Sequence, residues 1–464
     1  MSQECTNDVG GRSRWRTASA ALGASAVLLV AACSPPGSAP ERDNDQPADI
    51  STEVPTDEEI ELVMAHYEDG GLGESIERLI AAYEQMHPNI TITPRFTSFE
   101  DYGRSIRLTM SADAPPDIAQ AGQGYVMMGP LVEAGLLLPL DAYAEAYGWD
   151  ERIPEGLLAQ SRFQADARSF GDGNLYGLAL GGNMVGVFYN RRLAEQLDLD
   201  LPPATLADFE QALAAARDAG ITPVSLGNLE AWPANHILSS LMSRHQQDSE
   251  MLDWIYGREG ATFDTPSTRD ALAVLDRWVD ERFILESANG TADPAAIGEF
   301  IDGESLFLFT GNWSAATIDE GMGEDAGFML LPPLRAGDPQ RATGATTAPF
   351  GVHADSEYPD VAANFIDFMT SDEAADVLLE GGYAPLVPEA LESGAEVSGT
   401  RAAFNEAFAE VLADDGLTLY LDWSTVTMND ALFPVLQQLI GGGATPDDVI
   451  QTVQSDWETA RGSS

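Results

Sequence analysis

Residues 172–193, DGNLYGLALGGNMVGVFYNRRL, decide the fold of this chain. Their apolar residues predict two short strands, one around Tyr176 and one around Phe188. Gly181 and Gly182 lie between the strands, and glycine follows turns that larger residues avoid, so the pair predicts a turn. Asn190 then opens a helix. By itself the stretch could also be an ordinary enzyme hairpin, so the rest of the chain has to decide.

A strand–helix–strand unit precedes this stretch. Residues 61–65 predict a buried strand, residues 76–83 place apolar side chains on one helical face, and residues 90–92 alternate like a second strand. A further short strand is expected at residues 118–121. Such units form parallel sheets, which bind ligands beyond the carboxyl ends of their strands. The loops that follow these strands are therefore the first places to look for a site.

The first 32 residues have the features of a targeting segment. Arginines up to Arg16 precede an apolar run of small residues, which is too short to span a membrane by itself. The run ends in Val-Ala-Ala-Cys at residues 30–33, which resembles a bacterial lipobox. We expect residues 1–32 to be a lipoprotein signal peptide and Cys33 to be lipidated; the alternative is a plain secretory signal. Residues 33–56 are rich in Ser, Pro and acidic residues and predict a flexible tether.

The charge balance is strongly acidic. The chain carries 75 Asp and Glu against 23 Lys and Arg, for a net charge of −52, and all 23 are arginine. The absence of lysine excludes a P-loop lysine and a Schiff-base lysine. The charge argues against nucleic acid as a partner, because that binding needs basic phosphate contacts. Since concentrated salt screens such self-repulsion, we expect a salt-adapted, halophilic source; the alternative is an ordinary acidic secreted protein.

Several motifs together resemble the extracellular solute-binding proteins of sugar ABC importers, the family of maltose-binding-type proteins. The opening stretch supplies Tyr-Gly, Gly-Asn and Tyr-Asn pairs at the family's spacing. In chain order, the further matches are residues 131–141, 205–223, 311–313, 344–352, 371–374 and 381–385. Each motif is loose, but their order runs along essentially the whole chain after the tether.

The resemblance implies an α/β fold of the periplasmic-binding-protein type. Two lobes are expected, each a mostly parallel sheet flanked by helices, with three crossings of the chain between them. The N-terminal lobe would comprise residues 57–186 and 345–382, and the C-terminal lobe residues 187–344 and 383–464. The length of the chain also suits two lobes rather than one.

A sugar site should mix aromatic rings, which stack on C–H faces, with amides and carboxylates that bind hydroxyls. Loops after the predicted strands carry that mixture. The expected ligand-binding residues are Tyr67, Glu68, Gln120, Gln123, Asn183, Trp232, Asn312, Trp313, Tyr383, Asp422 and Trp423. Trp313 is the chief candidate, because it follows a predicted strand directly and occupies the family's Gly-x-Trp position. The competing interpretations are that Trp313 belongs to the core and that Asn183 only shapes a turn.

These features predict an extracellular, lipid-anchored, monomeric subunit of an ABC importer that captures a sugar or oligosaccharide and delivers it to the permease. We expect no catalytic residues, cofactor or metal, because the catalytic motifs are missing and the five histidines lack metal-ligand spacing. Two alternatives stay open. One is a secreted glycoside hydrolase or lyase, whose cleft would also be acidic and aromatic. The other is a lipoprotein that binds another polar small molecule.

Overall fold

The computed structural model describes residues 50–245, 249–387 and 397–462. The expected signal peptide, Cys33 and residues 33–49 of the tether lie outside the described residues. In the described part of the chain, no helix is long and apolar enough to cross a membrane.

The first sheet has the strand order β11-β3-β1-β2. Its strands are β1 (Ile60–His66), β2 (Ile90–Phe96), β3 (Ile118–Gln120) and β11 (Phe350–Val352). β1 runs parallel to β2 and β3, and β11 runs antiparallel to β3. The predicted strand–helix–strand unit is confirmed, since α1 (Gly70–Met86) joins β1 to β2 and buries its predicted apolar face. The parallel pairs bring the carboxyl ends of β1 and β3 to the same edge.

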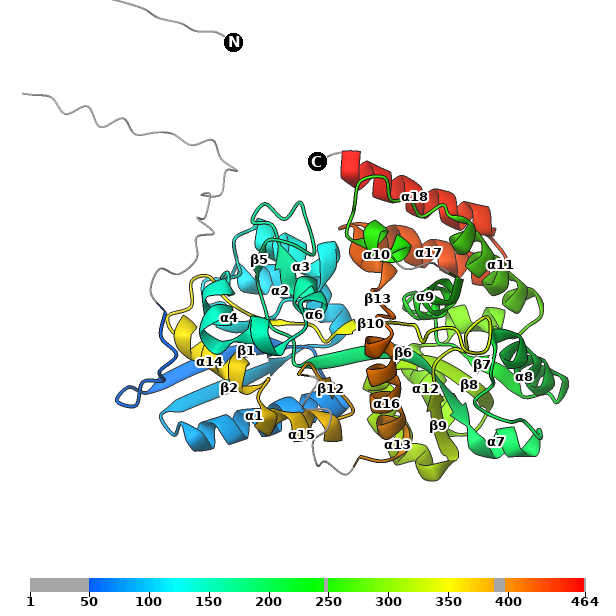
Figure 1. Cartoon of the computed structure of the whole chain (residues 1–464), viewed down its shortest axis with the longest axis horizontal. Coiled ribbons are helices and arrows are strands. Elements are labelled where there is room, and N and C mark those ends of the chain that lie inside the picture. The colour runs from blue at the N-terminus through cyan, green and yellow to red at the C-terminus, as the bar shows by residue number, and fades with distance from the viewer. Residues whose placement is uncertain (1–49, 246–248, 388–396, 463–464) are drawn as a thin grey trace, which may run out of the picture. The chain divides into compact units, whose positions relative to one another are not determined.

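Helices and a small hairpin surround this sheet (Figure 1). The helices are α2 (Phe99–Met110), α3 (Gly124–Glu133), α4 (Asp141–Tyr147), α5 (Trp149–Arg152), α6 (Glu155–Leu158), α14 (Pro359–Phe368) and α15 (Asp372–Glu380). The hairpin pairs β4 (Arg162–Phe163) with β5 (Asn174–Leu175).

The second sheet has the order β13-β10-β6-β8-β7, with β9 and β12 also paired to β6. Its strands are β6 (Gly181–Asn190), β7 (Thr222–Ser225), β8 (Ser305–Gly311), β9 (Ala326–Met329), β10 (Ala342–Thr346), β12 (Ala384–Pro385) and β13 (Leu417–Thr418). β6 is antiparallel to β8, β9, β10 and β12, whereas β7 with β8 and β10 with β13 are parallel. This sheet is therefore mixed rather than mostly parallel, because β6 runs opposite to its neighbours.

The helices of the second lobe are α7 (Arg191–Gln196), α8 (Leu206–Asp218), α9 (Pro233–His245), α10 (Glu250–Ile255), α11 (Pro266–Asp280), α12 (Asp293–Ile301), α13 (Ala315–Met322), α16 (Gly399–Ala413), α17 (Met428–Ile440) and α18 (Pro446–Gly462). Two of the expected helix starts are confirmed in detail. The Asn190 side chain accepts a bond from the Leu193 amide, and Thr205 accepts one from the Asp208 amide.

The predicted turn at Gly181-Gly182 is wrong, because both glycines lie inside the continuous strand β6. Glycine is needed at both positions because other parts of the chain approach the backbone there closely. A Cβ built on Gly182 would lie 2.1 Å from the Phe408 ring, and one on Gly181 would lie 2.7 Å from the carbonyl oxygen of Ala384. Two adjacent glycines fit either role, and a partner far away in the sequence decides between them.

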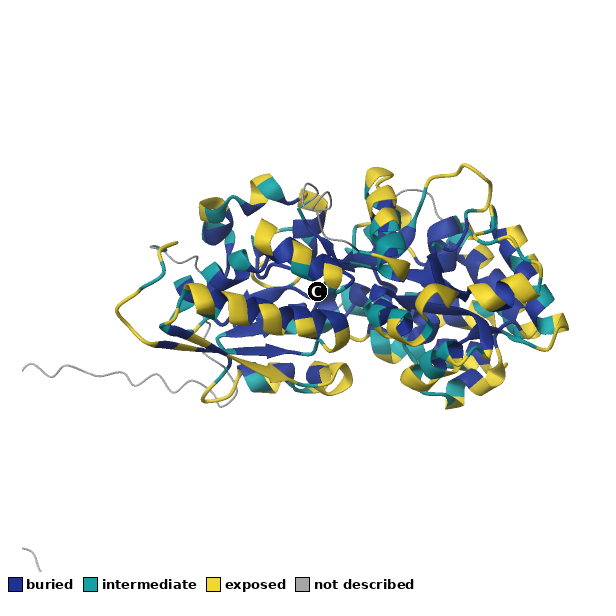
Figure 2. Cartoon of the chain, turned by 90° about the horizontal axis from the view of Figure 1, so that it is seen from below, coloured by how far each residue is buried: buried dark blue, intermediate teal, exposed yellow. Residues whose placement is uncertain are grey.

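The two-lobed α/β architecture with three crossings is confirmed. The chain passes between the sheets before β6, between β10 and β11, and after α15, where β12 pairs with β6. Backbone bonds tie the first two crossings together, including one from the Thr347 amide to the Gly181 carbonyl oxygen at 2.7 Å. Most strands of the two sheets are buried, whereas the edge strand β2 is exposed from Thr93 to Phe96, and the outer faces of the helices are exposed (Figure 2).

Candidate functional site

The first part of the candidate site lies where β1 and β3 end. Tyr67 and Glu68 directly follow β1, and Gln120 is the last residue of β3. The Gln120 side chain accepts a bond from the Tyr67 amide at 3.0 Å and donates one to Glu68 Oε1 at 2.7 Å. The Tyr67 ring meets the edges of Phe99 and Tyr102, with centroids 5.1 and 5.2 Å away. The structure thus brings together the three residues predicted from these strand ends.

Glu68 has an unusual electrostatic environment. Burial raises the pKa of its carboxyl to about 7, Asp69 adds to that rise, and the bond from Gln120 opposes it. At neutral pH the carboxyl is therefore partly protonated and can either accept or donate a hydrogen bond. Burial also raises the pKa of Tyr67, with Glu68 adding to the effect. Neutral groups of this kind suit an uncharged ligand that carries hydroxyl groups.

The second part of the site is an aromatic cluster around His236, on α9. The His236 ring lies 5.1 Å from Trp232, 5.4 Å from Trp313 and 5.8 Å from Tyr420, and Tyr420 lies 5.3 Å from Trp423. Burial lowers the pKa of His236 to about 3, so its imidazole is neutral. We call these five residues the aromatic cluster. It contains all three of the tryptophans predicted to bind ligand.

Two ring nitrogens of the aromatic cluster are buried without a hydrogen-bond partner among the described residues, Trp232 Nε1 and His236 Nδ1. Buried polar atoms normally have a partner, so an unpaired indole N–H at a candidate site is suited to a ligand oxygen. The neighbouring Asp422 accepts a bond from Asn235 at 3.0 Å, and burial raises its pKa to about 6.

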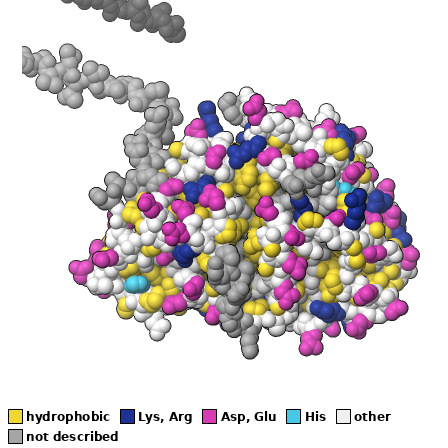
Figure 3. Space-filling model, viewed as in Figure 1, with side chains coloured by type: hydrophobic (Ala, Val, Ile, Leu, Met, Phe, Trp, Pro, Cys, Tyr) yellow, Lys and Arg dark blue, Asp and Glu magenta, His cyan; other side chains and the backbone are white. Residues whose placement is uncertain are grey.

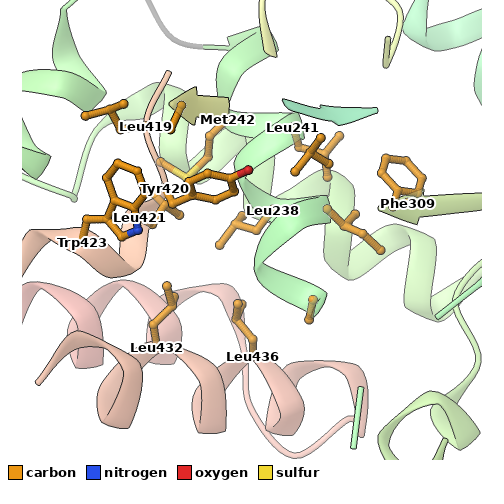
Figure 4. Packing of buried hydrophobic residues seen from close by; sticks show 14 of the residues in the cluster. Leu238, Leu241, Met242, Phe309, Leu419, Tyr420, Leu421, Trp423, Leu432 and Leu436 are labelled. Atoms are coloured by element: carbon orange, nitrogen blue, oxygen red, sulfur yellow. The ribbon is translucent and has the colours of Figure 1, made fainter. Parts of the chain in front are cut away.

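Tyr420 connects this cluster to the crossing strands, because its hydroxyl donates to Asn183 Oδ1 at 3.1 Å. In Figure 4, Tyr420 and Trp423 lie next to each other, near Leu238 and above Leu432 of α17. Trp423 is buried, and a Cβ built on Gly124 of α3 would lie 2.4 Å from the Cβ of Trp423. In this structure Trp423 packs between the lobes instead of presenting an open ring face.

Two further predicted side chains, Asn312 and Gln123, bond to the segments that cross between the lobes. Asn312 is 1% exposed; its Oδ1 accepts from the Met184 amide at 3.1 Å, and its Nδ2 donates to the Gly382 carbonyl oxygen at 2.8 Å. Gln123 donates to the Thr346 carbonyl oxygen at 2.6 Å. In this structure both side chains therefore hold backbone segments together.

Tyr383 and Tyr420 link the two parts of the site. Burial raises the pKa of Tyr383, and the charges of Glu68 and Asp69 raise it further; Tyr383 and Tyr420 in turn add to the raised pKa of Tyr67. Tyr67 and Trp313 also pack against the same cluster of buried residues, which contains both Tyr102 and Tyr420, so the strand ends of the first sheet and the aromatic cluster of the second lobe converge. A surface depression between α11 and α18, lined by Arg269 among others, contains none of the predicted residues.

The list of expected ligand-binding residues leaves out three members of this arrangement, which are Tyr420, His236 and Phe99. Tyr420 comes just after the two-residue strand β13, which is too short to show a periodic pattern. His236 lies on a helix that is buried along nearly its whole length. Phe99 opens α2 shortly after β2, so the same strand-end rule that found Tyr67 could have found it.

Comparisons with known proteins support the two-lobed fold. A family model described as bacterial extracellular solute-binding protein matches residues 69–376. An uncharacterized ABC transporter extracellular-binding protein of Pyrococcus horikoshii is 21% identical over 331 residues, covering 68% of this chain and 69% of the relative. A chitin oligosaccharide binding protein has a similar structure, with a TM-score of 0.71 and 22% identity over 87% of this chain and 99% of that one. A bacterial solute receptor with a substrate preference for β-D-galactopyranose aligns with a TM-score of 0.73 and 16% identity, over 86% and 99% of the two chains.

Proposed function

Because this chain belongs to the bacterial extracellular solute-binding protein family, we propose that it captures a sugar or oligosaccharide and delivers it to the permease of an ABC importer. The family consists of receptors that bind solutes and are not enzymes, so the hydrolase or lyase alternative is set aside. The partners are then the ligand and the membrane subunits of the importer, and the binding protein acts as a monomer.

The observation that carries the sugar proposal is the position of Trp313. Its partly exposed ring lies beside His236 and packs against apolar residues of both lobes. Glu68, Tyr383 and Asn183 provide hydroxyl-binding groups within the same arrangement, which is the mixture that sugar recognition needs. The ligands of the two similar structures, a chitin oligosaccharide and a galactopyranose, belong to the same chemical class.

In the proposed mechanism, the ligand lies between the lobes and bridges them. A ligand that contacts both lobes binds the closed form more tightly and shifts the population toward it. The proposed lobes follow the expected division, with their limits at the ends of β6 and β10: residues 57–180 with 347–382, and residues 181–346 with 383–464. The permease would then recognise the closed form.

A thermal-shift screen tests the ligand class. Purified protein lacking residues 1–33 is melted in molar NaCl with mono- and oligosaccharides, and with amino acids and polyols as controls. A sugar at a hundred times its dissociation constant should add about 2.7 kcal/mol to the free energy of unfolding. Stabilisation by an amino acid or polyol alone would favour the other open alternative, a receptor for a different polar solute.

The proposed location is the outer face of the cell membrane, reached through a lipid on Cys33. The motif at residues 30–33 and the following tether support this assignment. Replacing Cys33 with Ala should move the protein from the membrane fraction to the medium. Wild-type protein found free in the medium would contradict the anchor without affecting the binding function.

A further inference from the structure

Two exposed aromatic rings lie next to the candidate site. Among the large hydrophobic side chains that are exposed in the described residues, the aromatic ones are Phe96, at 55%, and Phe99, at 46%. The Phe99 ring contacts the edge of Tyr67 at 5.1 Å, and Phe96 lies 6.0 Å from the neighbouring His66. Exposed aromatic rings grouped at one place indicate a binding surface more often than scattered apolar residues do.

The segment from Leu229 to Trp232 leads from the aromatic cluster to the surface and also contains apolar and acidic side chains. Leu229 is 56% exposed, while Trp232 contacts His236 within the cluster. Between them, Glu230 Oε2 accepts a bond from the Asp293 amide at 3.0 Å, at the first residue of α12. An apolar side chain and carboxylate oxygens therefore stand just outside the cluster on this lobe.

One carboxylate from each of these two segments acts on Asp293. Burial raises the pKa of Asp293 to about 7, and the charges of Glu230 and then Glu100 raise it further. Glu100 is the residue after Phe99, at the start of α2. Glu100 at the start of α2 and Glu230 beside α12 therefore both contribute negative charge at Asp293.

We propose that Phe99 is the platform of an outer subsite, which holds a second, uncharged sugar unit of an oligosaccharide whose inner unit lies beside Tyr67 and Trp313. The inference rests on the proposed function. A flat ring that is half exposed can stack on the C–H face of a sugar, and the carboxylates of Glu100 and Glu230 can accept its hydroxyl hydrogens. The same carboxylates disfavour a uronate at this position, because like charges repel.

Chain length distinguishes this subsite from the inner site. The probes are chitin, xylan and malto-oligosaccharides of one to four units. Calorimetry in molar NaCl measures the affinity of each member of a series, beginning with the shortest member that binds. Phe99→Ala should reduce affinity about tenfold for members one or more units longer than the shortest, and less than about twofold for the shortest itself. Phe99→Leu, which keeps apolar volume without a flat face, should behave like Phe99→Ala, and Phe99→Trp should restore the wild-type dependence on length.

Leu108 provides the matched control, because it lies on the same helix, is 77% exposed and is remote from the helix start. Leu108→Ala should leave all affinities unchanged. If Phe99→Ala and Phe99→Leu weaken every member equally, or weaken none, the subsite is rejected while sugar binding stands. If neither these series nor any sugar of the thermal-shift screen binds the wild type, the proposed function fails and the subsite fails with it.

Discussion

The indole ring of Trp313 lies over the backbone of Gly311, so closely that a Cβ on Gly311 would fall 2.1 Å from the ring. Only glycine leaves room for the ring there. Gly311 ends β8, and the short 3-10 helix Asn312–Ser314 then positions Trp313. The family's Gly-x-Trp pattern therefore has a steric reason in this chain: the glycine fixes the position of the tryptophan ring.

We expect Trp313→Ala to weaken sugar binding by about 2 kcal/mol or more, as for a central contact residue. Because the ring is partly exposed, the loss in the free energy of unfolding should stay below the roughly 3–5 kcal/mol typical of a buried tryptophan. Calorimetry and chemical denaturation measure the two quantities. Trp278→Ala is the core reference, since Trp278 is fully buried on α11 and should lose stability without a specific loss of affinity. Unchanged affinity with a large loss of stability would make Trp313 a core residue.

Glu68 should make stability depend on pH. Its pKa rises from 4.5 to about 7 on folding, so the unfolded chain loses this proton at lower pH than the folded one. The stabilising contribution is complete below pH 4.5, declines as the pH rises to 7, and is absent above that. Melting curves between about pH 4 and 8 should show that Glu68→Gln removes part of this decline and raises stability most at the alkaline end. Glu61→Gln, at an exposed position of β1, should leave the decline unchanged. A decline of the same size in Glu68→Gln would contradict the assignment.

The glycine at position 182 should be essential for the crossing strand. Gly182→Ala places a methyl group against the Phe408 ring and should cost about 1–3 kcal/mol of stability, as overpacking does. Phe408→Leu in the same chain should recover part of that loss, because leucine lacks the outer ring atoms. Gly103 in α2 is the control, because a Cβ added there would have no atom within 4 Å. Gly103→Ala should stabilise the helix by about 0.5–1 kcal/mol. Equal effects at both positions would contradict the role of close packing.

Stability should rise with salt concentration well beyond about 0.1 M. The net charge is −52, and carboxylates are spread over the face seen in Figure 3, where they outnumber the arginines. The Debye length falls from about 10 Å at 0.1 M to about 3 Å at 1 M, so repulsion between neighbouring carboxylates continues to weaken over that range. Urea unfolding in NaCl and in KCl should give the same upward trend. A flat profile would refute the inference of salt adaptation and leave the binding function untouched.

The sequence could predict those parts of the fold that have local causes. The unit from β1 to β2 follows from apolar periodicity, and the caps at Asn190 and Thr205 follow from residue type. The Gly181-Gly182 pair could not be interpreted correctly, because its contact with Phe408 depends on residues far along the chain. The mixed strand directions of the second sheet could not be predicted for a similar reason, because the crossings between the lobes set the direction of its strands.

The residues of the candidate site also divide into those that local sequence predicts and those that depend on distant parts of the chain. The strand-end rule places Tyr67, Glu68 and Gln120 together, as the structure does. It cannot reveal that the Asn312 amide is occupied by backbone groups, or that Trp423 faces Gly124. Those outcomes depend on long-range packing, which residue type and spacing do not encode.

The continuity of β6 has a consequence for how the lobes can move. Every residue from Gly181 to Asn190 belongs to one continuous strand that pairs with β8, β9, β10 and β12, and its amide hydrogens should be among the slowest in the protein to exchange with deuterium. Rotation between the lobes must then be taken up by residues 179–180, 347–349 and 381–383, which connect β6, β10 and β12 to the first lobe. Deuterium uptake in those short connections should change when ligand binds, whereas uptake in β6 should stay the same because the strand moves as a rigid unit.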